Sequence, residues 1–168
     1  RVHLNQINNL LTLEQCESGS LDLRKDPVYL SDALEDAVMQ AKTKWQGEVS
    51  LDFDVEEPGE NMKVLGEVNL LTRIFNELIE NAAKANAQAH SSEAVDVRMK
   101  VEGQKLRVLI SDSGTGIPGE LRSQLFDRFR TINNTACTGM GLPMAERLIK
   151  LHGADITIHD GERKGTTA

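Results

Sequence analysis

Residues 95–110 carry the pattern that most constrains the fold. Apolar side chains alternate with polar ones from Val95 to Val101 and again from Leu106 to Ile110, and a polar turn around Gly103 separates the two runs. Strict alternation puts every second side chain on the same face of a strand, so this segment predicts a β-hairpin with one buried face. The hairpin leads directly to Asp112, which places this carboxylate at the exit of a strand.

Other segments predict the rest of a sheet and the helices that lie on it. Residues 49–55 alternate strictly and predict a further half-buried strand. Ser31 is expected to cap a helix that carries Leu34 and Val38 on its apolar face. Shorter strands are expected at 21–23, 27–30 and 63–65 and near 156–158, with a turn at 165–167, and further helices at 67–86, 120–130 and 139–152.

Length, charge and cysteine content exclude several classes of protein. A chain of 168 residues predicts one domain with an appendage. The net charge of −7 argues against a general nucleic-acid binder and against contact with a membrane surface. Cys16 and Cys137 lie far apart without CxxC spacing, which indicates a reducing compartment and no zinc site. Because the chain opens at Arg1 and has no membrane-length apolar run, we expect a fragment of a longer protein, which could be membrane-bound.

Residues 1–17 predict a separate amphipathic helix. Leu4, Ile7 and Leu11 are spaced as one helical face, and the polar turn that begins at Ser18 ends the helix. This helix could be the tail of a coiled-coil or four-helix dimer, or it could fold back on its own chain. The stretch is too short to decide between these alternatives.

The predicted helix at 67–86 carries three polar side chains on one face. Glu77, Asn81 and Lys84 are spaced to line up, while Leu78 and Ala82 fall largely on the other side. An amide oxygen is a ligand for Mg²⁺, a lysine can contact a phosphate, and a carboxylate can receive a proton. Taken alone, the same spacing is more common in a solvated helix face.

Glycine-rich turns follow Asp112 and precede the last helix. In Asp112-Ser113-Gly114-Thr115-Gly116, the carboxylate can accept a hydrogen bond from an exocyclic amine such as adenine N6, and the glycines allow a flat ring to approach the backbone. Gly139 and Gly141 open a helix, whose free N–H groups and positive end favour a phosphate. Each turn by itself could be an ordinary surface turn. Residues 131–138, which are small or polar, are expected to form a mobile lid.

The order of these segments resembles a known family. Glu77-x-x-x-Asn81-x-x-Lys84, Asp112-x-Gly114-x-Gly116, Phe126-x-x-Phe129, Gly139-x-Gly141-Leu142 and Gly165-Thr166 are similar to the N, G1, F, G2 and final Gly-Thr boxes of the histidine-kinase catalytic domain. That domain belongs to a wider family with gyrase, Hsp90 and MutL. Residues 21–168 resemble this catalytic ATP-binding domain, truncated at its last strand. Residues 1–20, here called the stem, look like the C-terminal part of the dimerisation helix that precedes it.

The resemblance implies a fold and a site. The fold would be an α/β (α+β) two-layer sandwich, the Bergerat fold, in which helices cover one face of a mixed, mainly antiparallel sheet and the helical stem precedes the sandwich. Asn81 would bind Mg²⁺, Lys84 a phosphate and Asp112 adenine, while Glu77 would activate the phosphoryl acceptor. Phe126 and Phe129 would anchor the lid. The other residues implied to contact ATP are Gly114, Gly116, Ile117, Arg128, Thr138, Gly139, Met140, Gly141, Leu142 and Thr166.

The resemblance also implies partners and leaves alternatives. No histidine has the sequence context of a phosphoryl acceptor, so the acceptor would lie on a dimerisation domain outside this chain. The parent protein would be a homodimer in the cytoplasm, or the cytoplasmic part of a membrane-bound sensor, and would pass its phosphate to a response regulator. Cys137 stands where the family has a glycine, which leaves the course of the lid open. The alternatives are a nucleotide-binding docking module without kinase activity and an ATPase of the gyrase, Hsp90 and MutL kind.

Overall fold

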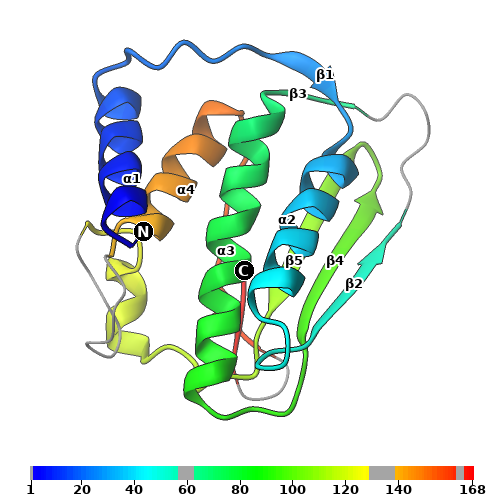
Figure 1. The fold of residues 1–168 in the computed structure, drawn as a ribbon. Coiled ribbons are helices and arrows are strands. Elements are labelled where there is room, and N and C mark those ends of the chain that lie inside the picture. The colour runs from blue at the N-terminus through cyan, green and yellow to red at the C-terminus, as the bar shows by residue number, and fades with distance from the viewer. Residues whose placement is uncertain (1, 57–62, 129–138, 162–164) are drawn as a thin grey trace.

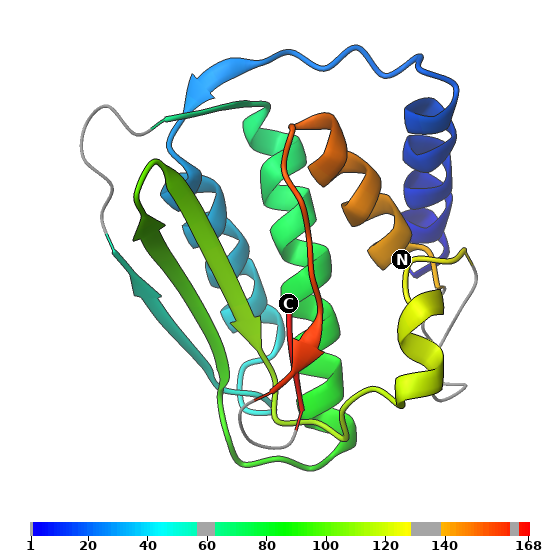
Figure 2. The ribbon, with the colours of Figure 1, turned by 180° about the vertical axis from the view of Figure 1, so that it is seen from behind.

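Helices and strands form two layers in a computed structural model that describes residues 2–56, 63–128, 139–161 and 165–168 (Figures 1 and 2). The main sheet has the strand order β2-β4-β5-β7-β6. Strand β2 (Leu51–Val55) runs parallel to β4 (Val95–Glu102), and every other pairing is antiparallel. The two-layer fold with a mixed, mainly antiparallel sheet is therefore confirmed. The remaining strands of this sheet are β5 (Lys105–Ser111), β6 (His159–Asp160) and β7 (Thr166–Thr167).

Three helices stand side by side over one face of this sheet, with α3 (Val68–Gln88) in the middle (Figure 1). Helix α2 (Leu30–Lys44) packs on one side of α3 and α4 (Gly141–Leu151) on the other. The alternating residues of β4 supply the matching apolar face, because Val95, Val97 and Met99 are fully buried. The other face of the hairpin is lined with charged side chains. The core thus lies between β4 and the helices, as the alternation predicts.

A second, two-stranded sheet joins the ends of two helices. Strand β1 (Asp26–Val28) pairs antiparallel with β3 (Val64–Gly66), which leads into α3. The strand predicted at residues 21–23 is wrong, since these residues have no regular structure. Ser31 is not the N-cap: helix α2 begins one residue earlier, at Leu30, after Tyr29. The helix starts without a side-chain cap, and its first residue, Leu30, is buried in the core.

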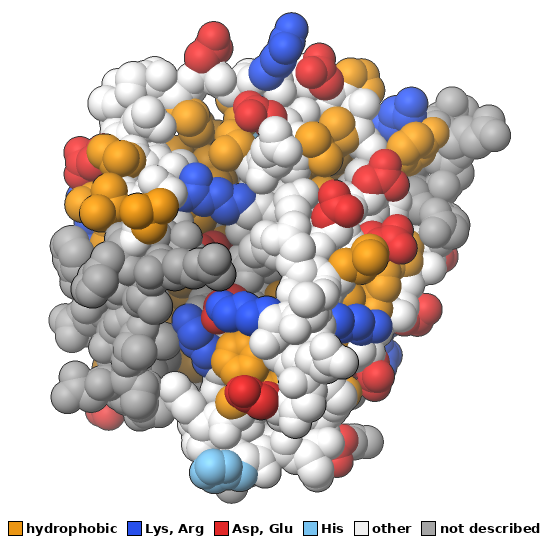
Figure 3. All heavy atoms as spheres, in the orientation of Figure 1, with side chains coloured by type: hydrophobic (Ala, Val, Ile, Leu, Met, Phe, Trp, Pro, Cys, Tyr) orange, Lys and Arg blue, Asp and Glu red, His pale blue; other side chains and the backbone are white. Residues whose placement is uncertain are grey.

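Helix α1 (Val2–Glu17) packs against α4 with an unexpected face. Its inward residues are Asn9, Thr12 and Leu13, which are all buried. The predicted apolar stripe points outward instead: Leu4, Ile7 and Leu11 are 68%, 56% and 55% exposed. Figure 3 shows hydrophobic side chains gathered over this part of the molecule. The stem therefore contacts its own chain through Leu13 together with two polar side chains, and the described residues leave Leu4, Ile7 and Leu11 uncovered.

The C-terminal third is less regular than the sequence predicts. The segment at 120–130 contains a short 3₁₀ helix, η1 (Gly119–Gln124), instead of an α-helix. Ile156 and Ile158 precede β6 and are not part of a strand, although Ile156 packs against the core. The expected lid, residues 131–138, lies outside the described residues. Among the helices described, none has both the length and the apolar character needed to cross a membrane.

Candidate functional site

Helix α3 is the element around which the candidate site is built. Glu77 and Lys84 are partly buried on this helix, and Asn81 between them is exposed. Within the described part of the chain, the Asn81 amide makes no hydrogen bond. The apolar residues of the same helix, such as Ile74 and Ile79, are buried in the core. The predicted amphipathic pattern therefore leaves the three polar side chains on the outer side of α3.

Close packing brings two glycine-rich turns onto α3. A Cβ atom placed on Gly141, the first residue of α4, would lie 2.2 Å from Oε2 of Glu77. A Cβ atom on Gly114 would lie 2.8 Å from the Cβ of Ala85. Ala85 is eight residues after Glu77, which is about 12 Å along a helix. The two turns thus meet α3 at points separated by a distance comparable with the length of a nucleoside triphosphate.

Asp112 is held in one orientation by backbone groups. Its Oδ1 accepts hydrogen bonds from the N–H groups of Gly114, at 2.9 Å, and Thr166, at 3.2 Å. Gly165 has a φ of +126°, and a Cβ atom there would lie 2.0 Å from the Asp112 carbonyl oxygen. Only glycine can therefore bring β7 this close to Asp112. The final Gly-Thr segment and the Asp112 turn form one unit.

The second oxygen of Asp112 remains open. Its Oδ2 accepts no hydrogen bond from the described residues, and none of their fully buried side-chain oxygens lacks a partner, so Oδ2 is accessible to solvent. Burial raises the pKa of this carboxyl group, and the two backbone hydrogen bonds oppose the rise. A fixed carboxylate with one open oxygen is a suitable acceptor for a planar amine.

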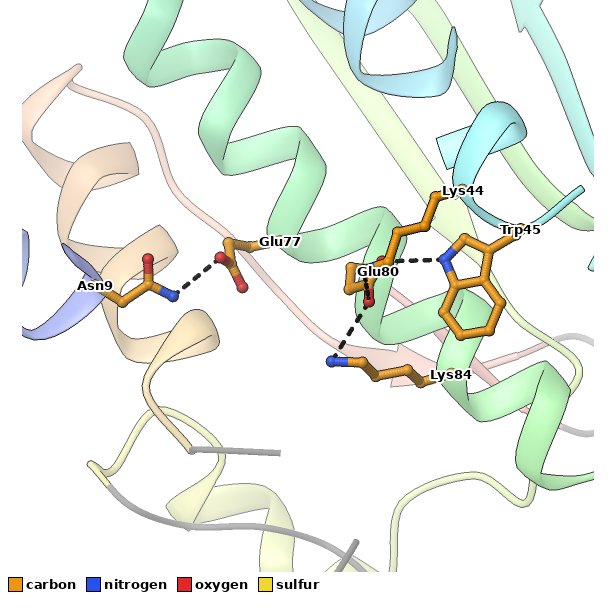
Figure 4. A network of polar contacts seen from close by, with 6 residues as sticks. All are labelled: Asn9, Lys44, Trp45, Glu77, Glu80 and Lys84. Carbon is orange, nitrogen blue, oxygen red and sulfur yellow. Dashed lines mark hydrogen bonds and ion pairs between the residues drawn. The ribbon is translucent and has the colours of Figure 1, made fainter. Parts of the chain in front are cut away.

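Glu77 is in contact with the stem. Asn9 Nδ2 donates a hydrogen bond of 3.0 Å to Glu77 Oε1 (Figure 4). Arg73, one turn earlier on α3, donates to Asn9 Oδ1 at 2.7 Å and to the Thr12 hydroxyl at 2.8 Å. These bonds explain why the polar face of α1 is the buried one, since Arg73 and Glu77 need polar partners. Sequence analysis missed this arrangement because it depends on residues more than 60 positions apart.

A second polar network holds Lys84. Glu80 accepts hydrogen bonds from Lys44 Nζ at 2.5 Å and Trp45 Nε1 at 3.0 Å, and Lys84 Nζ lies 3.6 Å from the same carboxylate (Figure 4). Burial acts to raise the pKa of Glu80, but these hydrogen bonds and the two lysine charges outweigh it and lower the pKa. The i,i+4 spacing of Glu80 and Lys84 could have predicted their pair. The contribution of α2 could not be seen in the sequence.

The start of α4 offers backbone N–H groups. Met140 precedes the helix and provides no side-chain cap. Its side chain is buried, which anchors the first turn of α4 to the rest of the chain. Gly139 before it has a φ of +64°. Uncapped N–H groups at a helix start are suited to an anion, and the positive end of the helix adds to the attraction.

The other residues that the sequence predicted for the site lie around Asp112, Glu77 and the start of α4, or outside the described residues. Arg128 forms ion pairs with Glu14 and Glu17 of the stem, so in this structure it contacts α1. Phe126 is half-buried, while Phe129 and Thr138 lie outside the described residues. Asn86, which sequence analysis did not select, is fully buried beside the Asp112 turn. Gly116 and Ile117, which follow the Asp112 turn, Leu142 of α4 and Thr166 of β7 are all half-buried.

Comparison with known proteins gives matches for both sequence and fold. Residues 66–168 match the family described as histidine kinase-, DNA gyrase B-, and HSP90-like ATPase. The chain is 28% identical over 164 residues to hybrid signal transduction histidine kinase D of Dictyostelium discoideum, which covers 94% of this chain and 10% of that protein. The chain therefore spans about a tenth of that relative's length.

Two solved structures share the fold. The mycobacterial sensor histidine kinase MprB superposes with a TM-score of 0.71 over 85% of this chain and 93% of that chain, at 21% identity. Full-length ShkA in complex with AMPPNP superposes with a TM-score of 0.81 over 99% of this chain and 35% of that chain, at 20% identity. The second comparison includes the stem as well as the sandwich.

Proposed function

The chain belongs to the family of histidine kinase-, DNA gyrase B- and HSP90-like ATPases, and we propose that it acts as the catalytic domain of a sensor histidine kinase in a two-component system. It would transfer the γ-phosphate of ATP to a histidine on a dimerisation domain outside this chain. The kinase names of its relatives favour this branch of the family over the gyrase, Hsp90 and MutL branches. A response regulator would receive the phosphate, and the reaction would take place in the cytoplasm.

The open oxygen of Asp112 is the observation that carries the proposal. Oδ1 is fixed by two backbone N–H groups, so Oδ2 has a defined direction and can accept a hydrogen bond from adenine N6. The base would lie beside this turn, which the absence of a side chain at Gly114 allows to pack directly against Ala85 of α3. ShkA, which has the same fold, was solved with AMPPNP, and this supports an adenine nucleotide as the ligand.

The phosphates would lie between α3 and the start of α4. The N–H groups around Gly139 and Gly141 suit the phosphate oxygens, and Lys84 is on the same side of α3. Asn81 is exposed and lacks a partner among the described residues, so its amide oxygen can bind Mg²⁺. That ion commonly uses one or two protein ligands together with water and phosphate oxygens, so the absence of an acidic cluster from the described residues is compatible with it. When bound, Mg²⁺ would neutralise phosphate charge.

Glu77 would assist the transfer itself. Its Oε1 accepts from Asn9, whereas its Oε2 faces Gly141 at the phosphate end. One nitrogen of the acceptor imidazole would attack the γ-phosphorus as the bond to the β-phosphate oxygen breaks, and Glu77 would accept the proton from the other ring nitrogen. The chain's contribution is mainly alignment and charge neutralisation.

Calorimetric titration of ATP, with and without Mg²⁺, tests the nucleotide site. We expect the wild-type chain to bind, Asp112→Ala to abolish binding, and Asn81→Ala to bind without Mg²⁺ dependence. Val101→Ala, on the distant hairpin, serves as a control that should bind normally. Absence of binding by the wild-type chain would reject an ATP site and leave a docking module as the better hypothesis.

Phosphotransfer in trans tests the reaction. A dimerisation domain from a relative is mixed with the chain and labelled Mg-ATP, and label on its histidine is measured. Transfer that is lost in Glu77→Ala is the expected result. Steady release of free phosphate without a labelled histidine would instead indicate an ATPase of the gyrase kind.

A further inference from the structure

We propose that Asn86 is a positioning residue for adenine recognition, because it anchors the Asp112 turn to helix α3. The inference rests on the proposed nucleotide site and adds to it a residue that does not contact the base. Asn86 lies two residues after Lys84, and its side chain is completely buried. It therefore belongs to the part of α3 that faces the sheet, where its buried neighbours are apolar.

Both ends of the Asn86 amide have a backbone partner. Its Oδ1 accepts a hydrogen bond of 2.7 Å from the N–H of Ser113, and its Nδ2 donates one of 2.9 Å to the carbonyl oxygen of Glu93. Glu93 precedes β4 and Ser113 follows β5. A single side chain therefore joins α3 to the segment that enters the hairpin and to the segment that leaves it. A buried amide that lost either partner would be costly, which favours one arrangement of the three elements.

The Ser113 bond determines where Asp112 can point. Ser113 lies between Asp112 and Gly114, and the N–H of Gly114 fixes Asp112 Oδ1. On the other side, Thr166 of β7 donates to the same oxygen. If the turn moved relative to α3, these bonds would shift together and the direction of Oδ2 would change. Asn86 thus acts on the base through Ser113 and Asp112.

The experiment that tests this proposal measures discrimination between adenine and guanine nucleotides, which a purely structural role of Asn86 would not alter. Affinities for Mg-ATP and Mg-GTP are determined for each variant, and their ratio is the readout, because guanine has an acceptor where adenine has its exocyclic amine. Asn86→Leu keeps approximate size and removes both hydrogen bonds. Asn86→Asp keeps the acceptor for Ser113 and loses the donor to Glu93. Ile79→Ala, also fully buried on α3, is the matched control for lost stability.

We expect the wild-type chain to prefer ATP and Asn86→Leu to reduce this preference about tenfold, as the loss of one well-formed hydrogen bond predicts. GTP affinity should stay unchanged. Asn86→Asp should retain the preference within about twofold, and Ile79→Ala should retain it while unfolding at a lower temperature. An unchanged preference in Asn86→Leu, or an equal loss in Asn86→Asp, would overturn the positioning role.

Two further outcomes are also decisive. If Asn86→Leu does not fold, hydrogen exchange of the Ser113 amide in the wild-type chain is measured instead; protection like that of α3 supports the role, and rapid exchange rejects it. If the wild-type chain binds no ATP, the proposed function fails and this inference fails with it. Binding by the wild-type chain with normal discrimination in Asn86→Leu rejects the inference alone.

Discussion

The two ends of the site along α3 are held by different kinds of contact. At the Asp112 end, backbone N–H groups and the buried Asn86 amide fix the turn, and Gly165 packs against backbone atoms. At the Glu77 end and along the outer side of α3, side chains hold one another: Asn9 contacts Glu77, and Glu80 holds Lys84. Most of the side-chain contacts around Glu77 and Glu80 involve long or partly exposed side chains.

This difference indicates which end is preorganised. Backbone hydrogen bonds among packed elements cannot rearrange without moving a strand, so the Asp112 end is set before a ligand arrives. The charged side chains of the other end can exchange partners, since exposed ion pairs contribute little stability. We therefore expect substitutions that disturb the backbone packing at the Asp112 end to have large effects on folding, and substitutions at the Glu77 end to have small ones.

The largest expected effect is that of Gly165→Ala. The new Cβ would collide with the Asp112 carbonyl at 2.0 Å, and the φ of +126° is unfavourable for alanine. The atoms that the new Cβ would meet belong to the backbone of Asp112 and Ser113, so they cannot rotate away and β7 must move. Destabilisation of at least about 3 kcal/mol is expected in chemical denaturation. Gly153→Ala provides a control, since that glycine also has a positive φ but nothing lies near its Cβ position. Equal losses in the two variants would contradict a backbone collision.

Asp112→Asn should separate binding from stability. The amide oxygen can still accept from Gly114 and Thr166, but the NH₂ group would face the adenine amine with a donor. ATP affinity should fall about 100-fold, by analogy with hydrogen bonds to charged groups, and the ratio of ATP to GTP affinity should fall too. Because burial raises the pKa of Asp112, its charge is unfavourable in the folded state at neutral pH. The variant should therefore unfold at the same or a higher temperature. A large loss of stability would refute the argument that the charge of Asp112 is unfavourable in the folded state.

The same raised pKa predicts a pH dependence of binding. Protonated Asp112 can no longer accept at both oxygens, so ATP affinity should fall on acidification. The fall should begin above the pH at which an ordinary aspartate titrates, because the folded-state pKa is raised. Below the apparent pKa, affinity should decrease about tenfold per pH unit. Titrations over a pH series check this, and Asp112→Asn, which has no proton to gain there, should show a flatter profile.

Glu80→Gln tests the side-chain network on the outer side of α3. The pKa of Glu80 is lowered by Lys44, Trp45 and Lys84 against the effect of burial, so its charge stabilises the folded chain above the ordinary glutamate range. Substitution should cost about 0.5–1 kcal/mol at neutral pH. The difference from wild type should vanish as the pH falls through and below that range. Urea denaturation at several pH values measures it, and a difference that persists at low pH would indicate lost packing instead of lost charge.

The sequence predicted those parts of the molecule that depend on local pattern. The alternation of residues 95–110 gave the hairpin, and the spacing of Glu77, Asn81 and Lys84 gave their common face on α3. Predictions failed where local pattern and tertiary contact disagree. Residues 21–23 alternate like a strand, but they pair with no strand in the described chain. Local periodicity cannot show whether a partner strand is available.

Contacts between distant segments were the part that could not be predicted. The stem has an apolar stripe, yet it buries Asn9 and Thr12 beside Leu13, because Arg73 provides partners for the two polar side chains. In the same way, Asn86 looks like an ordinary helix residue until Ser113 and Glu93 are brought beside it. In both cases a buried polar group is explained only by its partner, which is 27 residues away for the Ser113 bond and 64 and 68 residues away for the two Asn9 bonds.

The smallest effect on folding is expected for Gly141→Ala, which makes it the sharpest test of the comparison. Its Cβ would come nearly as close to Glu77 Oε2, at 2.2 Å, as the Gly165 Cβ would to the Asp112 carbonyl oxygen, at 2.0 Å, but here the obstacle is the tip of a flexible side chain. Glu77 can rotate away, and alanine at a helix start recovers up to about 1 kcal/mol of helix propensity. The unfolding free energy should therefore change by less than about 0.5 kcal/mol. Transfer to the acceptor histidine should nevertheless fall, because Glu77 is displaced from the phosphate end. If Gly141→Ala destabilised the chain as much as Gly165→Ala does, the Glu77 end would be as rigid as the Asp112 end, and the distinction between them would be lost.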